Sequence, residues 1–315
     1  MSICLKSSYS CCALCPRVCG VDRSSGATGF CGMSSELRIS RVGLHMWEEP
    51  CLSGTRGSGT IFFTGCNLGC VFCQNYEISR RVGRGAGVGK VSDPTTCHIK
   101  PGKFFSIEDF AQAMLSLQSQ GAHNINFVTG THYIPHIVEG VRLAREQGLV
   151  LPTLYNCGGY ESVEALRLLD GTIDIYLPDM KFFSPDVSRK YCGARDYFER
   201  SRDAIAEMVR QCPVQEFDSD GIMRRGVIVR HLMLPGLLFD TKHILDYLTE
   251  TYGNQITISL MNQYTPMPGV PEELATPLNP KHYESMVNYL SILGQENAYT
   301  QEGGTVSESF IPDFE

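Results

Sequence analysis

Short apolar runs alternate with longer amphipathic segments along most of the chain. The apolar runs have the length and composition of buried strands, and they fall at 60–64, 124–129, 150–156, 172–177, 227–234 and 256–261. The segments between them carry apolar residues at helical spacing, which predicts helices over about 106–120, 135–147, 161–169, 185–211, 241–252 and 281–293.

Local signals mark the ends of several predicted helices. Ser106 is followed three residues later by Asp109, which is the pattern of a capping box, and Gly121 can take the left-handed position after the same helix. Pro135 opens the next helix and Gly148 closes it. Strands that alternate with helices in series predict an α/β fold with a parallel sheet and right-handed crossovers.

The first 54 residues follow a different pattern. They are rich in Cys, Gly and Ser, and only 37–42 alternates like a strand. We therefore expect three parts: a small Cys-rich segment over 1–54 organised by a cluster or a metal, a barrel over 55–300, and a short acidic tail over 301–315.

Composition limits the possible classes of protein. Of 315 residues, 43% are hydrophobic and 19% charged, and no apolar run approaches the ~20 residues that a membrane helix needs. The N-terminus lacks the basic start and continuous apolar stretch of a signal peptide, so we expect a cytoplasmic protein without a membrane partner. A net charge of −7 and a pI near 5.7 argue against general nucleic-acid binding.

Three of the fourteen cysteines stand out by their spacing. Cys66, Cys70 and Cys73 form a CxxxCxxC pattern directly after the apolar run 60–64. Cysteine thiolates hold iron–sulfur clusters, and three of them can fix three irons of a cubane while the fourth iron stays open. Structural zinc is the alternative, but it usually takes four ligands in paired spacing.

A second group of cysteines lies near the N-terminus. Cys12, Cys15, Cys19 and Cys31 supply four soft ligands, which suit one zinc ion or a second iron–sulfur cluster equally, and a metal-free segment is the alternative. The isolated cysteines are interpreted as small buried hydrophobic residues or incidental thiols, and they are Cys4, Cys11, Cys51, Cys97, Cys192 and Cys212.

The segment GCNLGCVFC, with an aromatic residue before its last cysteine, resembles the cluster loop of the radical S-adenosylmethionine (SAM) enzymes. The stretches LHMWEEP, YNCGGYE, DIYLPDMKF and RGVIVRHLMLPG resemble the uncharacterised relatives of pyruvate formate-lyase activating enzyme. The resemblance implies a partial (β/α)6 barrel, a 4Fe-4S cluster on Cys66, Cys70 and Cys73, and SAM bound at the open iron. Reduction of SAM there would give a 5′-deoxyadenosyl radical, because the cofactor supplies the radical chemistry and the protein places it.

The same resemblance assigns roles at the ends of the predicted strands, where barrel folds place their ligands. Gly130, with Thr131 and His132 after it, corresponds to the stretch that receives the amino group of SAM. Lys181 would reach the SAM carboxylate, and Asp179 would lie near the substrate backbone or a monovalent cation. The other residues expected to contact SAM are Phe72 at the adenine, Asn156 and Arg230.

The expected function is hydrogen abstraction by that radical, and the substrate favoured by the resemblance is a glycine of a glycyl radical enzyme. A small metabolite or another peptide is the alternative substrate. A non-catalytic iron–sulfur or zinc protein is the alternative of another class, but a carrier has no need of Lys181 and Arg230 at strand ends. The expected electron donor is a low-potential flavodoxin or ferredoxin.

Overall fold

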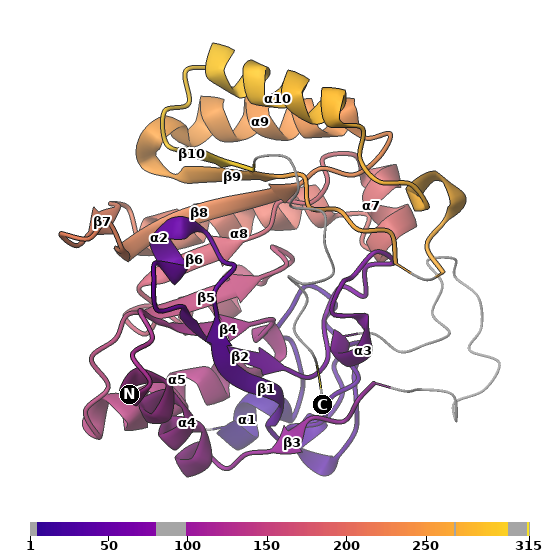
Figure 1. Ribbon diagram of the computed structural model, residues 1–315. Coiled ribbons are helices and arrows are strands. Elements are labelled where there is room, and N and C mark those ends of the chain that lie inside the picture. Colours follow the sequence, from indigo (N-terminus) through magenta and orange to yellow (C-terminus); the bar gives the residue numbers. More distant parts are fainter. Residues whose placement is uncertain (1–4, 80–98, 268, 302–313, 315) are drawn as a thin grey trace.

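The computed structural model describes residues 5–79, 99–267, 269–301 and 314 (Figure 1). Cys4, Cys97 and most of the predicted acidic tail lie outside the described residues. No helix of the described ranges combines the length and the apolar character that crossing a bilayer requires.

A ten-stranded sheet forms the centre of the molecule and runs in the order β10-β9-β8-β6-β5-β4-β2-β1-β3, with β7 beside β8. Neighbouring strands from β2 to β10 along this path are parallel, whereas β1, β3 and β7 each pair in antiparallel fashion. The strands are β1 (Arg38–His45), β2 (Ser58–Phe63), β3 (Lys103–Phe104), β4 (Ile125–Val128), β5 (Thr153–Cys157), β6 (Ile175–Pro178), β7 (Glu216–Phe217), β8 (Met223–Leu232), β9 (Thr257–Met261) and β10 (Ala298–Thr300).

Helices connect the parallel strands and cover the outer face of the sheet (Figure 1). The α-helices are α1 (Leu5–Tyr9), α2 (Pro50–Ser53), α3 (Tyr76–Ser79), α4 (Ile107–Ser119), α5 (Ile134–Glu146), α6 (Val163–Arg167), α7 (Pro185–Cys192), α8 (Tyr197–Gln211), α9 (Leu238–Tyr252) and α10 (Pro280–Ile292). Short 3-10 turns occur at η1 (Arg23–Ser25), η3 (Thr131–Tyr133), η4 (Gly253–Gln255) and η5 (Glu272–Leu274). The predicted α/β class with a mostly parallel sheet is confirmed.

Local chemistry explains where several elements begin and end. The predicted capping box is present at α4, where the Ser106 hydroxyl accepts a hydrogen bond from the Asp109 amide and the Asp109 carboxylate accepts one from the Ser106 amide. The single helical region expected over 185–211 is two helices, because Gly193 takes a left-handed conformation with φ of 63° and ends α7. β5 starts at Thr153 rather than at Val150, whose side chain is exposed.

Residues alternate between the two faces of the sheet, as the pleat requires. On β5, for example, Tyr155 and Cys157 pack in the large cluster under the helices, whereas Leu154 belongs to a separate apolar cluster inside the barrel. This inner cluster also contains Cys51 and Leu52 from α2, together with Ile175, Leu177, Met223 and Ile228. The short helix α2 therefore fills the barrel interior at the level of these residues.

The Cys-rich N-terminal region is present and packs against the barrel. Its β1 continues the sheet by pairing with β2, and α1 contacts α5. Arg23 is completely buried, and its guanidinium donates hydrogen bonds to the backbone oxygens of His132 at 2.7 Å and Ser34 at 2.7 Å. The contact with His132 fixes the region to the turn after β4, and the boundary at residue 54 stays a prediction.

Candidate active site

A cavity of about 400 Å³ opens inside the barrel, at the carboxyl ends of the parallel strands. It is lined by residues from the cysteine loop after β2, from the strand ends and from the segment before α2. Most of the sequence-predicted site residues meet here, namely Cys66, Cys70, Cys73, Phe72, Asn156, Asp179, Lys181 and Arg230. These residues come from the cysteine loop, from β5 and β8 and from the segment after β6, and they converge on one space, as the barrel topology predicts.

The three loop cysteines are close enough to influence one another. The pKa of the Cys66 thiol is raised to about 12. Burial is the largest cause, and the neighbouring Cys70 and Cys73 contribute to the same rise. The Cys73 sulfur lies 3.1 Å from the Ser79 hydroxyl, and the Leu68 amide donates to the Cys66 sulfur at 3.3 Å. Free thiols in this place stay protonated, so a positively charged centre is needed to hold them as thiolates.

The donor set fits a cluster better than a single ion. Within the described ranges, no three His, Cys, Asp or Glu side chains converge tightly enough to hold one metal ion. In a cubane each thiolate binds a different iron, so its three ligands need not meet at one point. The residues that would hold a 4Fe-4S cluster are therefore Cys66, Cys70 and Cys73.

One further thiol lies beside this loop. Cys192, at the end of α7, is within hydrogen-bonding reach of Cys70, and this contact is the largest cause of the raised pKa of Cys70. The Cys192 thiol also donates to the Ser188 backbone oxygen at 3.0 Å. The sequence placed Cys192 among the isolated cysteines, because 119 positions separate it from Cys73 and no spacing rule connects them.

A network of charged groups crosses the cavity at the strand ends. The Lys181 ammonium donates to Asp179 at 2.7 Å, and Arg230 donates to the other oxygen of Asp179 at 3.2 Å. Arg230 also donates to the side-chain oxygen of Asn156 at 2.5 Å. Burial lowers the pKa of Lys181, but Asp179 and the nearby Cys70 raise it by more, so Lys181 stays an ammonium.

The stretch after β4 contributes less to the cavity than the resemblance implied. Thr129 lines it, whereas Gly130, Thr131 and His132 do not appear among its lining residues. His132 is buried and its Nε2 lies 2.7 Å from the Thr64 backbone oxygen, and burial lowers its pKa to about 3. The Thr131 hydroxyl donates to Glu161 at 2.8 Å. A role for these three residues toward SAM stays a prediction.

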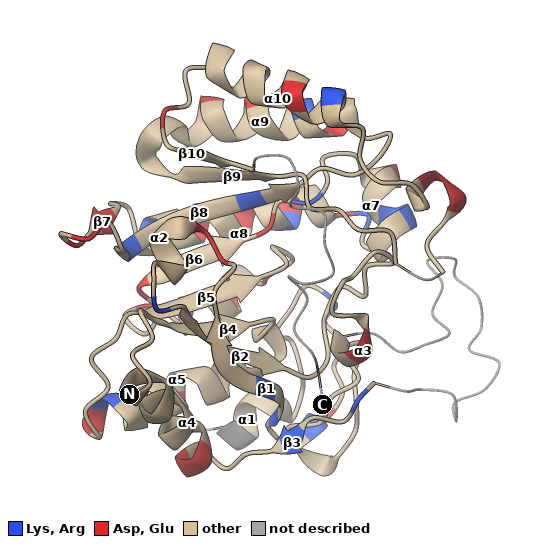
Figure 2. Ribbon diagram, in the orientation of Figure 1, with Lys and Arg blue, Asp and Glu red and all other residues tan. Residues whose placement is uncertain are grey.

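Two acidic cavity residues were missed by the sequence analysis, Glu48 and Glu49. Glu48 accepts hydrogen bonds from Arg230 at 3.0 Å and from Asn126 at 2.9 Å, and Glu49 is buried beside it. Figure 2 shows this acidic segment between β1 and α2, close to β8. The available signal was the pair of adjacent acidic residues in the otherwise apolar stretch LHMWEEP.

The four N-terminal thiols lie near one another but outside the cavity. Cys12, Cys15 and Cys31 are buried and Cys19 is half-buried. Burial raises the pKa of Cys15 to about 12, and Cys31 and Cys19 add to it. Because tetrahedral zinc needs converging ligands, the lack of a converging set in the described ranges gives no support to zinc here.

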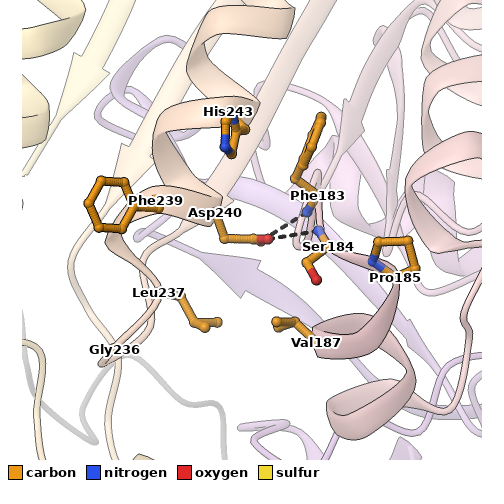
Figure 3. A pocket seen from close by; sticks show the side chains of 9 residues that line it. All are labelled: Phe183, Ser184, Pro185, Val187, Gly236, Leu237, Phe239, Asp240 and His243. Carbon is orange, nitrogen blue, oxygen red and sulfur yellow. Dashed lines mark hydrogen bonds between the residues drawn. The ribbon is translucent and has the colours of Figure 1, made fainter.

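A second hollow of about 450 Å³ lies between the starts of α7 and α9 and shares no residue with the first (Figure 3). In it the carboxylate of Asp240 accepts hydrogen bonds from the Phe183 and Ser184 amides at 2.9 and 2.7 Å. The ring of His243 stacks on Phe183 with centroids 4.8 Å apart. These contacts hold the chain before α7 in place, which explains why polar groups lie in this hollow.

The chain is similar to several known proteins. The chain is 29% identical over 263 residues to an uncharacterized protein of Methanocaldococcus jannaschii, covering 83% of this chain and 68% of that one. Among solved structures it is similar to Streptococcus suis SuiB bound to S-adenosylmethionine, with 12% identity, a TM-score of 0.48 and coverage of 76% of this chain and 49% of that one. It therefore spans about half the length of SuiB.

Two further structures are similar to the chain. A radical SAM methyltransferase from Sphaerobacter thermophilus has 15% identity and a TM-score of 0.49, with 78% of this chain and 66% of that one covered. QueE from Escherichia coli has 11% identity and a TM-score of 0.44, with 84% and 94% covered. The family model of the radical SAM superfamily matches residues 60–248, which include the cysteine loop and the strands from β4 to β8. The chain therefore belongs to the radical SAM superfamily.

Proposed function

We propose that this protein cleaves SAM reductively and uses the resulting radical to abstract a hydrogen atom from a substrate held in the barrel cavity. Membership of the superfamily implies SAM and a 4Fe-4S cluster. Cys66, Cys70 and Cys73 would hold the cluster, which would supply one electron from a low-potential flavodoxin or ferredoxin for cleavage of the C5′–sulfur bond of SAM into methionine and a 5′-deoxyadenosyl radical. Hydrogen abstraction from a substrate C–H bond would then give 5′-deoxyadenosine.

The observation that carries the proposal is the meeting of three thiols with a charged network in one cavity. Cys66, Cys70 and Cys73 would hold the cluster, and the buried ammonium of Lys181 offers a point charge to the SAM carboxylate. Phe72 lines the same cavity, with its ring edge-on to Phe182 at a centroid distance of 5.9 Å. An electron carrier would have no use for the buried cations.

The decisive experiment is anaerobic reconstitution with iron and sulfide, followed by reduction with dithionite in the presence of SAM. We expect 5′-deoxyadenosine and methionine in equal amounts. Single Cys→Ala variants at 66, 70 and 73 should form no 5′-deoxyadenosine, whereas Cys11→Ala, which removes an exposed thiol, should behave as wild type. Cleavage of SAM by any of the three loop variants would refute the ligand assignment.

For the substrate, the resemblance to pyruvate formate-lyase activating enzyme favours a glycine of a glycyl radical enzyme. Its support in this chain is the Asp179-Met180-Lys181 stretch, whose two charged residues line the cavity. The test is electron paramagnetic resonance of a candidate glycyl radical enzyme after incubation with the reduced protein and SAM. A glycyl doublet would support this substrate, and its absence with active protein would count against it.

A small metabolite or a peptide side chain is the second candidate, and one observation favours it. Acidic residues sit at the inner end of the cavity, where Glu49 is buried and forms no salt bridge with a residue that the structure describes. A backbone glycine carries no charge that could compensate a carboxylate there, whereas a small charged molecule can.

A further inference from the structure

The segment between β1 and α2 forms the inner end of the cavity. Glu49 precedes Pro50, the first residue of α2, and the next residues, Cys51 and Leu52, pack against Ile175 and Ile228 inside the barrel. Alternate residues of a strand face the same side of the sheet, so the next inward-facing residue after Leu154 is Asn156 and the next after Ile228 is Arg230. Both lie closer to the cysteine loop, because the strands are parallel. Glu48 and Glu49 therefore form an acidic floor of the cavity, next to α2 and facing the site proposed for SAM.

The two floor carboxylates have different surroundings. Glu48 is paired with Arg230 through a contact of 3.0 Å. Glu49 is only 8% exposed, and its one recorded side-chain partner is the Ser259 hydroxyl on β9. Its second carboxylate oxygen, Oε2, is buried and has no hydrogen-bond partner among the described residues, although the residue lines the cavity.

The charges around the cavity do not balance within the described ranges. The cavity is lined by three carboxylates, those of Glu48, Glu49 and Asp179. It is lined by two cations, Lys181 and Arg230. Both cations form their ion pairs with other carboxylates, because Lys181 pairs with Asp179 and Arg230 pairs with Asp179 and Glu48. Burial raises the pKa of Glu49, and the Arg230 charge, which acts on Glu49 without forming a salt bridge with it, lowers that pKa by less. His45 adds no positive charge at neutral pH, since burial lowers its pKa to about 4.

A buried carboxylate oxygen without a hydrogen-bond donor is costly, and the cost falls when a partner with N–H groups arrives. A metal ion is a poor partner here, because no three potential ligand side chains converge in the described part of the chain. An organic nitrogen cation needs only one carboxylate and room beside it, and the cavity provides about 400 Å³.

We propose that Glu49 binds an ammonium or guanidinium group of the substrate, so that the substrate is a small organic cation. The inference rests on the proposed function, because it places this molecule between the floor and the SAM site. It also assigns separate tasks to the two glutamates: Glu48 holds Arg230 in place, and Glu49 selects the substrate by charge.

Trp47 gives a direct measurement of binding at this floor. It is the single tryptophan of the chain, it precedes Glu48 and it lines the cavity. The experiment titrates the anaerobically reconstituted, SAM-saturated, unreduced protein with methylguanidinium chloride and follows Trp47 emission. Methylurea, which has a similar shape and no charge, is the matched control ligand, and potassium chloride tests a metal cation at equal ionic strength.

We expect a saturable change with methylguanidinium and none with methylurea or potassium over the same range. Glu49→Gln should weaken methylguanidinium binding roughly ten- to 150-fold, as loss of a charge-assisted hydrogen bond predicts. Glu36→Gln, a change at an exposed residue outside the cavity, should bind as wild type. Equal binding of methylurea, or displacement by potassium, would overturn the proposal without any variant.

The affinity for SAM separates this inference from the proposed function. If Glu49→Gln weakens SAM binding as much as methylguanidinium binding, Glu49 serves the cofactor and the inference is wrong. If wild-type protein binds methylguanidinium but never cleaves SAM on reduction, the proposed function fails while the cation site stands. If Glu49→Gln does not fold, the wild-type comparison of the two ligands decides alone.

Discussion

The guanidinium of Arg230 donates a hydrogen bond of 3.0 Å to the carboxylate of Glu48, and this contact joins β8 to the segment before α2 across the cavity. The same guanidinium donates to Asp179 at 3.2 Å. Arg230 is thus the common partner of two buried carboxylates from distant parts of the chain. Its contacts fix the depth of the cavity, because the floor cannot move without breaking them.

Replacing Arg230 by Gln should destabilise the fold as well as the site. The change leaves Glu48 without its cation in a buried place, and breaking a buried ion pair costs about 3–5 kcal/mol. Anaerobic denaturant unfolding checks this value. Arg142→Gln removes two surface pairs on α5, with Glu139 and Glu146, and should cost about 1 kcal/mol. Equal stability of the two variants would show that the Arg230 contacts are energetically neutral.

Replacing Lys181 by Ala should weaken SAM binding and leave the cluster intact. Loss of a charge-assisted contact costs about 1.5–3 kcal/mol, which is roughly ten- to 150-fold in affinity. Asp179 keeps Arg230 as a partner, so the variant should still fold. Equilibrium dialysis with labelled SAM measures the affinity, and Lys190→Ala, at an exposed lysine on α7, is the control. Unchanged affinity would remove Lys181 from the SAM site.

The parts of the fold that local sequence dictates were predictable. Ser106 and Asp109 announce α4 because a capping box needs only residues three apart. The barrel strands were found because buried parallel strands are continuous apolar runs, although β5 was placed three residues too early. Short elements such as β10 escaped prediction, since three residues carry no periodicity of their own.

The residues of the candidate site also fall into two groups, those that the sequence predicts and those that it does not. Cys66, Cys70 and Cys73 share one loop, and Asp179, Lys181 and Arg230 end barrel strands, so motif and topology together predicted that they would meet. Glu49 and Cys192 could not be predicted in this way. Glu49 reaches the cavity because α2 turns back into the barrel, and Cys192 reaches Cys70 through the packing of α7. Both depend on tertiary contacts that no local pattern records.

Replacing Cys192 by Ala should lower the reduction potential of the cluster while leaving its iron content unchanged. The single S–H of Cys192 donates to the Ser188 backbone oxygen, and Cys70 lies within its reach. A Cys70 thiolate that holds iron would be a charged acceptor for this S–H, and hydrogen bonds to ligand sulfurs tune such potentials. Removing a donor makes the ligand sulfur more electron-rich, which favours the oxidised cluster. Redox titration followed by electron paramagnetic resonance measures the shift, with Cys11→Ala as control. Loss of iron from the Cys192 variant would instead make this thiol a ligand.

The N-terminal thiols can be tested apart from the loop. If Cys12, Cys15, Cys19 and Cys31 hold a metal, the triple Ala variant at 66, 70 and 73 should still contain iron or zinc by elemental analysis. Metal binding would be coupled to folding of the segment that carries these thiols, so a chelator should expose residues 1–54 to protease before the barrel. A metal-free triple variant with a protease-resistant N-terminal region would identify the four cysteines as ordinary buried residues.

Glu161 should make the stability of the protein fall as pH rises. Its carboxyl group is buried, accepts hydrogen bonds from Thr131 at 2.8 Å and Tyr155 at 3.1 Å, and forms none of the salt bridges recorded in the described ranges. Burial raises its pKa to about 8, from an ordinary value of 4.5. Between these two values the folded protein keeps a proton that the unfolded chain has lost.

The free energy of unfolding should therefore fall between pH 4.5 and pH 8 by up to about 1.4 kcal/mol per pH unit, and should level off above pH 8. Glu161→Gln keeps the shape and the hydrogen-bond acceptor but removes the titration. In anaerobic denaturant unfolding, the free energy of unfolding of the variant should match that of wild type near pH 5 and exceed it at pH 8.5. At the higher pH only wild type has a carboxyl group that must either be buried as a charge or stay protonated when the unfolded chain has lost the proton. Glu164→Gln, at an exposed position on α6, should follow wild type at both values. A Glu161→Gln variant that loses stability with pH as steeply as wild type would mean that another group is responsible.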